Sequence, residues 1–292
     1  MTPKTKLILD PYDHLDAVDE FLDFFGLKNK SASLAYLEQI LSFYARLPYE
    51  NISKIITLSD DFLSPDHIRL PGQIITDHIR YHLGGTCFSL TFFLQTILVK
   101  HDFTCYPVTA HMRNRPNEHC ALVVNLEKKK YLIDPGYLLT RPMEIDPDKP
   151  RLYQSPFTGV ELTFDSGEER YHLYTFDRQQ IKWRYCFEDR PLSAEDFLKY
   201  WQLSFYKGTM HGICLVQIRR DGLTYMHNDF LQVSTIDGKK KQRVGSDYQT
   251  VVKDIFDIAP EMVEKAKAAI SANMALERKY NIYKKAKKDE TD

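Results

Sequence analysis

The chain contains 292 residues, more than the usual single-domain size of about 100–150 residues, so we expect several packed subdomains. Its 39 basic and 40 acidic side chains give a net charge of −1, and without an overall positive field we expect no nucleic-acid partner. The first residues lack the apolar run of a signal peptide and no segment reaches the roughly 18 apolar residues of a membrane span, so we expect a cytoplasmic protein with no membrane partner.

The first hundred residues carry the pattern of helices. Apolar side chains recur at helical spacing in four segments, residues 15–25, 33–46, 73–83 and 88–99. Gly26 provides a stop for the first helix, and Pro48 ends the second because the residue before a proline avoids the α region. We therefore expect residues 1–103 to form a helical N-terminal bundle.

After Phe103 the pattern changes to the alternation of β-strands. The expected strands cover residues 106–112, 119–126, 131–134, 160–164, 171–176 and 182–187. A polar turn at 127–130 connects the second and third of them. We expect residues 104–190 to form a central antiparallel β-barrel.

The last third mixes both patterns. It predicts a helix at 194–201, strands at 213–219 and 224–228 joined by a turn at 220–223, and helices beyond Tyr248. We expect residues 191–292 to form an α/β lid. The order of helical, β and α/β segments predicts an α+β fold with three subdomains packed as one body.

The cysteines direct the search for chemistry. Five of them, at positions 87, 105, 120, 186 and 214, show neither the pairing of a disulfide framework nor a zinc-binding CxxC motif. Cys87 follows two glycines at the expected start of a helix, where free N–H groups and the helix dipole lower a thiol pKa. An isolated cysteine is more often a packing residue, so the assignment of Cys87 depends on its partners.

The other four cysteines have no base near them in the sequence. Cys120 alternates with His119 along a strand and should point to the opposite face. We therefore expect these four to be packing thiols.

A thiolate nucleophile needs a base, and the base needs an acceptor that orients it. His119 opens one expected strand and Asp134 ends the next, so a hairpin between them brings both side chains to the same end of the ladder. Alternatively, this hairpin carries a surface histidine and a turn-forming Asp-Pro-Gly. Together with Cys87, the catalytic interpretation is favoured.

Four motifs resemble those of arylamine N-acetyltransferases and occur in the same order. They are Arg46-Leu47-Pro48-Tyr49-Glu50-Asn51, Leu83-Gly84-Gly85-Thr86-Cys87, Glu118-His119-Cys120-Ala121-Leu122-Val123-Val124 and Asp134-Pro135-Gly136-Tyr137. The resemblance implies that family's fold, in which a helical bundle, a β-barrel and an α/β lid surround a papain- or transglutaminase-like catalytic core.

The resemblance also implies a two-step, ping-pong transfer of an acetyl group with Cys87, His119 and Asp134 as catalytic triad. Cys87 would attack acetyl-CoA, the acyl donor, and an arylamine, hydrazine or N-hydroxyarylamine would take the acetyl group from the cysteine. His119 would relay the proton while Asp134 fixes the imidazole. No metal is implied.

Other site residues follow from the same motifs. We expect Tyr49, which occupies the family's aromatic position, to bind substrate together with Thr86 and Phe88. Gly84 and Gly85 are expected to support the site by permitting a tight turn and a close approach of substrate.

The chain departs from the family pattern at three positions. Leu83 stands where the family usually has an arginine that pairs with the glutamate of the first motif, so Glu50 needs another partner, for which we expect Arg80 or His82. Ser89 and Thr91 stand where the family commonly has Glu or Gln and then Asn, so the contacts that brace the helix should differ.

These departures leave two alternatives to arylamine acetylation. The triad could serve an amide synthase or a transglutaminase-like acyltransferase or hydrolase with another acyl donor. The chain could also be a non-catalytic binding protein in which the missing arginine at position 83 has disabled the site.

Two further features are expected to lie outside the chemistry. His78 and His82 have the spacing of a zinc-binding helix but lack a third ligand, so we expect no metal there. Two basic runs, at 239–243 and 284–288, are expected to be a solvated turn and a frayed terminus rather than parts of the site.

Overall fold

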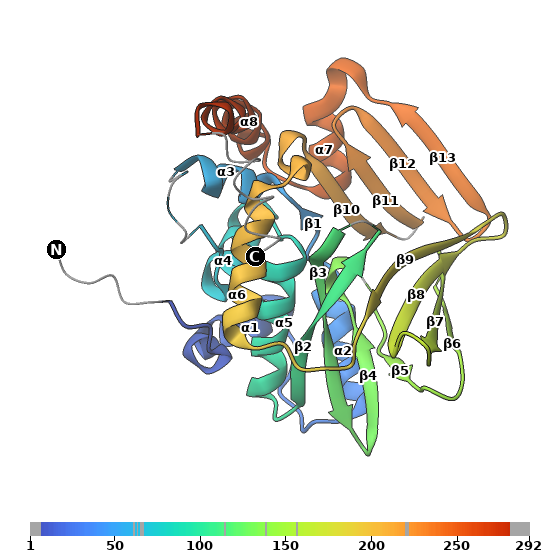
Figure 1. The fold of residues 1–292 in the computed structure, drawn as a ribbon. Helices are drawn as coiled ribbons and strands as arrows, with labels where there is room; N and C mark the ends of the chain where they lie inside the picture. Colours follow the sequence, from blue (N-terminus) through green and yellow to red (C-terminus); the bar gives the residue numbers. More distant parts are fainter. Residues whose placement is uncertain are drawn as a thin grey trace.

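The computed structural model describes residues 7–280 apart from 61, 63, 65, 66, 114, 138, 156, 220 and 221. After a 3-10 turn at Pro11–His14, five helices follow in the N-terminal part: α1 (Leu15–Phe25), α2 (Leu34–Tyr44), α3 (Ile52–Asp60), α4 (Pro71–Tyr81) and α5 (Cys87–Lys100). Figure 1 shows α5 in the middle of this group, and most of its side chains are buried. Gly26 ends α1 in the left-handed conformation, and Ser33 caps the start of α2 by accepting a hydrogen bond from the Tyr36 N–H.

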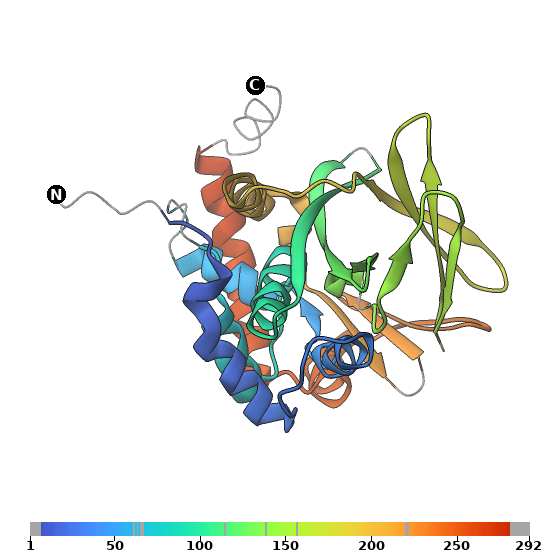
Figure 2. The same ribbon diagram turned by 90° about the horizontal axis from the view of Figure 1, so that it is seen from below.

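Eight antiparallel strands form a nearly closed barrel beside the helices (Figures 1 and 2). They are β2 (Thr104–Met112), β3 (Arg115–Leu126), β4 (Lys129–Ile133), β5 (Met143–Ile145), β6 (Arg151–Gln154), β7 (Gly159–Asp165), β8 (Arg170–Phe176) and β9 (Ile181–Phe187). Their order in the sheet is β5-β4-β3-β2-β9-β8-β7-β6. Alternate side chains, among them Val108, Val123 and Leu173, fill the interior as a separate apolar cluster.

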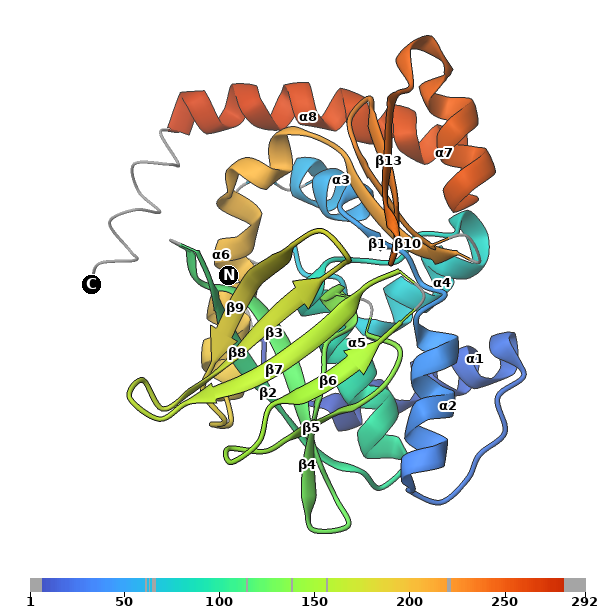
Figure 3. The ribbon, with the colours of Figure 1, turned by 90° about the vertical axis from the view of Figure 1, so that its right-hand side faces the viewer.

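A second antiparallel sheet contains β1 (Tyr49–Glu50), β10 (Cys214–Arg219), β11 (Gly222–His227), β12 (Phe230–Thr235) and β13 (Gly238–Arg243) in this order. The C-terminal part also contains three helices: α6 (Ala194–Leu203), which packs on α5, α7 (Tyr248–Phe256) and α8 (Pro260–Tyr280). Figure 3 shows α8 running above α3 and this sheet almost edge-on. Strand β1 comes from the N-terminal part, so this sheet ties the two ends of the chain together.

The α+β architecture is confirmed, with N-terminal helices, an antiparallel barrel and a C-terminal part that mixes strands and helices. The boundaries at 103/104 and 190/191 stay a prediction. Helix α3 and strands β1, β5, β6, β12 and β13 were not anticipated, and the turn expected at 220–223 lies partly outside the described residues. Among the described helices, none combines the length and apolar character that a membrane crossing requires.

Candidate active site

Cys87 is the first residue of α5, as the two glycines before it predict. The backbone N–H of Thr86 donates to Ser89 Oγ (3.0 Å), which fixes the first turn of the helix. A Cβ on Gly84 would lie 1.9 Å from the carbonyl oxygen of Pro48, so only glycine fits there. The loop that carries Cys87 is therefore held against the segment just before β1.

His119 and Asp134 meet at the end of the β3–β4 hairpin. His119 Nε2 lies 2.7 Å from Asp134 Oδ2, and the Asp134 side chain is fully buried. Two more groups donate to this carboxylate: Tyr185 Oη to Oδ2 (2.7 Å) and the Tyr137 N–H to Oδ1 (3.1 Å). Tyr185 comes from β9, and no motif in the sequence singles it out.

The electrostatics of the site favour a thiolate and an imidazolium. Burial alone would lower the pKa of His119, but the charges and hydrogen bonds of Asp134 and Cys87 outweigh it and raise this pKa to about 10. A hydrogen bond from Cys120, followed by interactions with His119 and Lys54, outweighs burial and holds the pKa of Cys87 well below its ordinary value. Because Asp134 occupies Nε2, Nδ1 is the ring nitrogen left to exchange a proton with Cys87.

Cys120 has a closer relation to the site than the sequence suggests. It packs in the apolar cluster that includes Cys87 and Phe92, as expected of a packing thiol, and its Sγ lies 3.4 Å from Thr91 Oγ1. It also interacts with Cys87 directly, and burial together with Cys87 raises the pKa of Cys120 well above the ordinary thiol value. Cys120 is thus a neutral donor beside the thiolate.

The expectation that Arg80 or His82 pairs with Glu50 is wrong. Arg80 is exposed on the outer side of α4, and His82 Nε2 lies 3.3 Å from Asp257 Oδ2 instead. The buried guanidinium of Arg69, in the segment that leads into α4, lies 3.7 Å from the buried Glu50 carboxylate. The contact therefore comes from the segment before α4 and not from the helix itself.

Arg69 makes three hydrogen bonds besides its ion pair with Glu50. Its Nη1 donates to the Gly84 carbonyl (2.8 Å) and to Ser53 Oγ (2.6 Å), and its Nη2 donates to Asp77 (2.7 Å). Arg69 thus pairs with Glu50 in place of the arginine that the family usually has at position 83. The alternative of a site disabled by the missing arginine loses its main support.

A cavity with a volume of about 760 Å³ opens above Cys87 and His119, between the barrel and the second sheet. Tyr49 and Thr86 line it, and their role in binding substrate stays a prediction. Phe88 does not, and this expectation is wrong: its ring is buried against Phe197, with ring centroids 5.4 Å apart. One step along a helix turns a side chain by about 100°, which carries Phe88 away from the face of Cys87.

Cationic side chains are numerous along this cavity. They are Lys54, Arg115, Lys182, Arg184, Lys207, Lys239 and Lys241. The expectation that the run at 239–243 is a solvated turn is wrong, because it forms β13 and two of its lysines line the cavity. The second run, at 284–288, lies outside the described residues.

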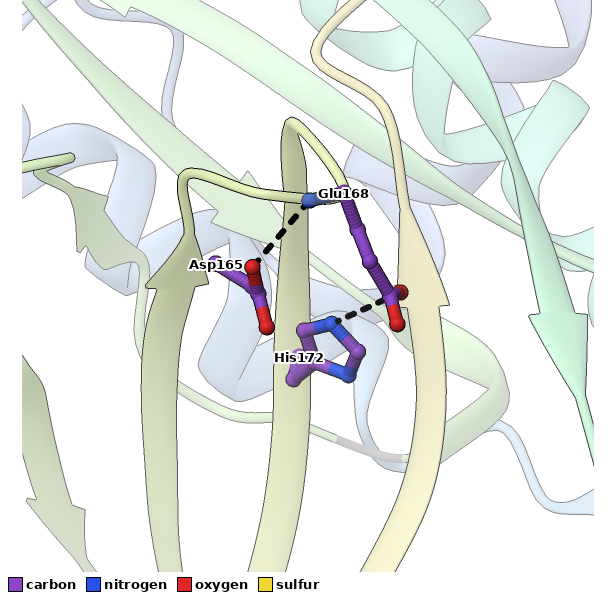
Figure 4. A group of neighbouring side chains, drawn as sticks. All are labelled: Asp165, Glu168 and His172. Atoms are coloured by element: carbon purple, nitrogen blue, oxygen red, sulfur yellow. Dashed lines mark hydrogen bonds and ion pairs between the residues drawn. The ribbon is translucent and has the colours of Figure 1, made fainter.

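Asp165, Glu168 and His172 form the one cluster of three metal-type ligands within the described part of the chain (Figure 4). The Trp183 indole N–H, which can only donate, lies 3.0 Å from His172 Nδ1, so the neutral ring carries its proton on Nε2. That Nε2 lies 3.4 Å from Glu168 and has no lone pair for a metal.

His78 and His82 have the spacing of a zinc-binding helix. Burial lowers the pKa of His78 to about 4, and its Nδ1 lies 2.9 Å from the Leu83 carbonyl.

Comparisons with known proteins identify the family and the fold. A family model described as N-acetyltransferase matches residues 33–264. The solved arylamine N-acetyltransferase of Mycobacterium abscessus has a similar fold with a TM-score of 0.76; it is 17% identical, and the match covers 94% of this chain and 99% of that one. The corresponding protein of Salmonella typhimurium gives a TM-score of 0.71 at 14% identity, over 88% and 98% of the two chains.

A third arylamine N-acetyltransferase, from Bacillus cereus, is described as having a unique Cys-His-Glu catalytic triad. Its TM-score is 0.64 at 19% identity, and the match covers 84% of this chain and 99% of that one. At such identities the likeness concerns the fold alone. Comparison with individually curated proteins finds no match.

Proposed function

The chain belongs to the arylamine N-acetyltransferase family of enzymes, and we propose on this basis that it transfers an acetyl group from acetyl-CoA to an arylamine, a hydrazine or an N-hydroxyarylamine. One observation carries the proposal. Cys87 begins a helix at the floor of a cavity, beside His119, whose Nε2 lies 2.7 Å from the buried Asp134 carboxylate. This is the nucleophile, base and orienting acid that acyl transfer through a cysteine requires.

In the first half-reaction the Cys87 thiolate attacks the carbonyl carbon of the thioester. The tetrahedral oxyanion lies within reach of the first backbone N–H groups of α5, which have no partner within the helix. Collapse of this intermediate forms acetyl-Cys87 and breaks the bond to the CoA sulfur, which takes a proton from His119. The enzyme is left acetylated, with a neutral imidazole.

In the second half-reaction the acceptor amine attacks acetyl-Cys87. The neutral imidazole of His119 takes the proton that the amine nitrogen loses as it forms the amide bond. The cysteine leaves as a thiolate, and the ion pair with the imidazolium is restored. Asp134 keeps the ring oriented throughout, and three donors hold its carboxylate in place.

The cationic side chains of the cavity support the proposal that the acyl donor carries phosphates. Lys182 and Arg184 on β9 face the same cavity as Lys239 and Lys241 on β13. The phosphates of CoA are strong hydrogen-bond acceptors, and a groove with several cations along its walls attracts them. We propose these four side chains as the phosphate contacts of the donor.

Mass spectrometry of the intact protein tests the proposal. After incubation with acetyl-CoA and without acceptor, we expect one acetyl group on the protein, assigned to Cys87 by peptide mapping. Cys87→Ser is the matched control and should carry no thioester. Addition of an arylamine should remove the group and release the N-acetyl product, whereas absence both of the adduct and of CoA release would overturn the proposed function.

A further inference from the structure

Tyr49 places a phenol hydroxyl in the catalytic cavity, and the proposed mechanism does not use it. The residue belongs to β1 and lines the cavity together with Cys87 and Thr86. Among the residues that the structure describes, none forms a hydrogen bond with Tyr49 Oη. This oxygen is not sealed inside the protein either, so a molecule in the cavity can reach it. The hydroxyl is therefore a free donor in the catalytic cavity.

The backbone fixes this residue beside the loop that carries the nucleophile. Tyr49 forms a parallel bridge with Gly85, and the Glu50 N–H donates to the Gly85 carbonyl at 2.9 Å. Gly85 precedes Cys87 by only two residues. On its other side Tyr49 pairs with Val216 of β10, whose side chain lines the same cavity. Tyr49 is thus held from both sides in the wall next to the thiol.

The hydroxyl lies near the thiol but does not bond to it. Burial, and after it the negative charge of Cys87, raise the pKa of Tyr49 well above its ordinary value. The hydrogen bonds that stabilise the thiolate come from Cys120 and His119, and Tyr49 supplies none of them. The phenol therefore stays protonated, and its O–H remains available to a group that is attached to the sulfur.

The acyl carbonyl oxygen is the polar atom that the reaction brings closest to the sulfur. When the thiolate or the acceptor amine attacks the carbonyl carbon, an electron pair of the C=O bond moves onto this oxygen. The pair returns when the bond to the leaving group breaks. A tyrosine hydroxyl or a backbone N–H aimed at such an oxyanion stabilises the transition state.

We propose that Tyr49 Oη donates a hydrogen bond to this oxyanion, together with the first N–H groups of α5. The phenol keeps its proton throughout, so the proton transfers of His119 are unchanged. The inference rests on the proposed function and adds a catalytic side chain that acts in both half-reactions.

Tyr49→Phe tests the proposal by removing the hydroxyl alone. Because this hydroxyl has no partner within the described protein, the unfolding temperature should stay within about 2 °C of the wild type. Rapid mixing with acetyl-CoA measures the first half-reaction, and mixing of the acetylated enzyme with an arylamine measures the second. We expect both rate constants to fall about 100-fold, the usual effect of removing one oxyanion donor.

Alkylation of Cys87 by iodoacetamide separates an oxyanion donor from a group that acts on the thiolate. In this reaction the thiolate displaces iodide from a saturated carbon, and no oxyanion forms. The rate of alkylation and its pH dependence should therefore be the same in Tyr49→Phe as in the wild type.

Tyr225→Phe is the matched control. Tyr225 of β11 pairs with Val216, so it lies in the same row of the same sheet as Tyr49 and also lines the cavity. Its backbone does not contact the loop that carries Cys87, because β10 lies between β11 and β1. The variant makes the same chemical change and should leave both half-reactions close to those of the wild type.

Four results would overturn the proposal. They are unchanged rates in Tyr49→Phe, an equal loss in Tyr225→Phe, a loss of the acceptor step alone, and a parallel loss of alkylation with a shift to higher pH. The third would make the hydroxyl a contact of the acceptor, and the fourth would make it a donor to the thiolate. If the wild type forms acetyl-Cys87, each result counts against Tyr49 alone, whereas failure to form it counts against the proposed function.

Discussion

Replacing Arg69 with methionine should destabilise the protein and slow the acetylation of Cys87. The variant leaves the carboxylate of Glu50, which is fully buried, without the guanidinium 3.7 Å away, and it removes the donor to the Gly84 carbonyl. Removing one partner of a buried ion pair typically costs about 3–5 kcal/mol in the free energy of unfolding. This is a large share of the free energy of unfolding of a typical protein, which is roughly 5–15 kcal/mol.

The pH dependence of this loss follows from the titration of Glu50. Burial raises the pKa of Glu50 and Arg69 is the first of the groups that counteract it, so the variant should have a still higher pKa. An acid whose pKa is higher in the folded than in the unfolded state gains a proton on folding, and stability falls as pH rises through that window. The destabilisation should therefore be larger at pH 8 than at pH 5.

Urea unfolding at both pH values, with acetyl-CoA single turnovers, measures these effects. Arg80→Met is the matched control, because this exposed arginine is the partner that the sequence suggests, and it should change the free energy of unfolding by less than about 0.5 kcal/mol. In Arg69→Met combined with Glu50→Gln, the loss should be smaller than the sum of the single losses. Equal losses from Arg69→Met and Arg80→Met would refute the reasoning.

Three further predictions concern the triad. Tyr185→Phe removes one of the three donors to Asp134 and should slow single-turnover release of CoA about 10-fold, the value of one hydrogen bond to a charged group; an unchanged rate contradicts it. Cys120→Ala should raise the pKa of Cys87, seen as a shift to higher pH of its alkylation by iodoacetamide, and a shift to lower pH would contradict the assigned donor. In the wild type the acetylation rate should rise from acid pH as the Cys87 thiol loses its proton. It should fall again near pH 10, where the His119 imidazolium loses its proton. A single inflection at the ordinary thiol pKa of about 8.5 would contradict the ion pair.

The sequence predicts those elements and residues whose pattern lies within one short stretch of the chain. Apolar periodicity predicts α1 with both ends, because the spacing of side chains along one helix is a local property. The positions of Cys87, His119 and Asp134 follow from motifs that each lie within a few residues. The nearness of His119 to Asp134 also follows, since a short hairpin joins them.

What the sequence does not predict depends on contacts between distant segments. Arg69 and Tyr185 reach the site from a loop and from another strand, and their own neighbours in the sequence give no hint of it. Strand β13 is not predicted because its consecutive lysines resemble a solvated loop. An edge strand tolerates such lysines, which discourage pairing with another chain, and the same side chains here line the cavity.

The segment 49–54 explains why the first motif is informative although none of its residues reacts. Tyr49 pairs with Val216 of β10, and the Glu50 N–H donates to the Gly85 carbonyl (2.9 Å). Asn51 accepts from the Cys214 N–H (2.7 Å) and donates to the carbonyl of Gly212 (2.8 Å). One short segment thus fixes the second sheet against the loop that carries the nucleophile. Because β10 and the Gly85 carbonyl both bind this segment, a shift of β10 should change the position and the reactivity of the Cys87 thiol.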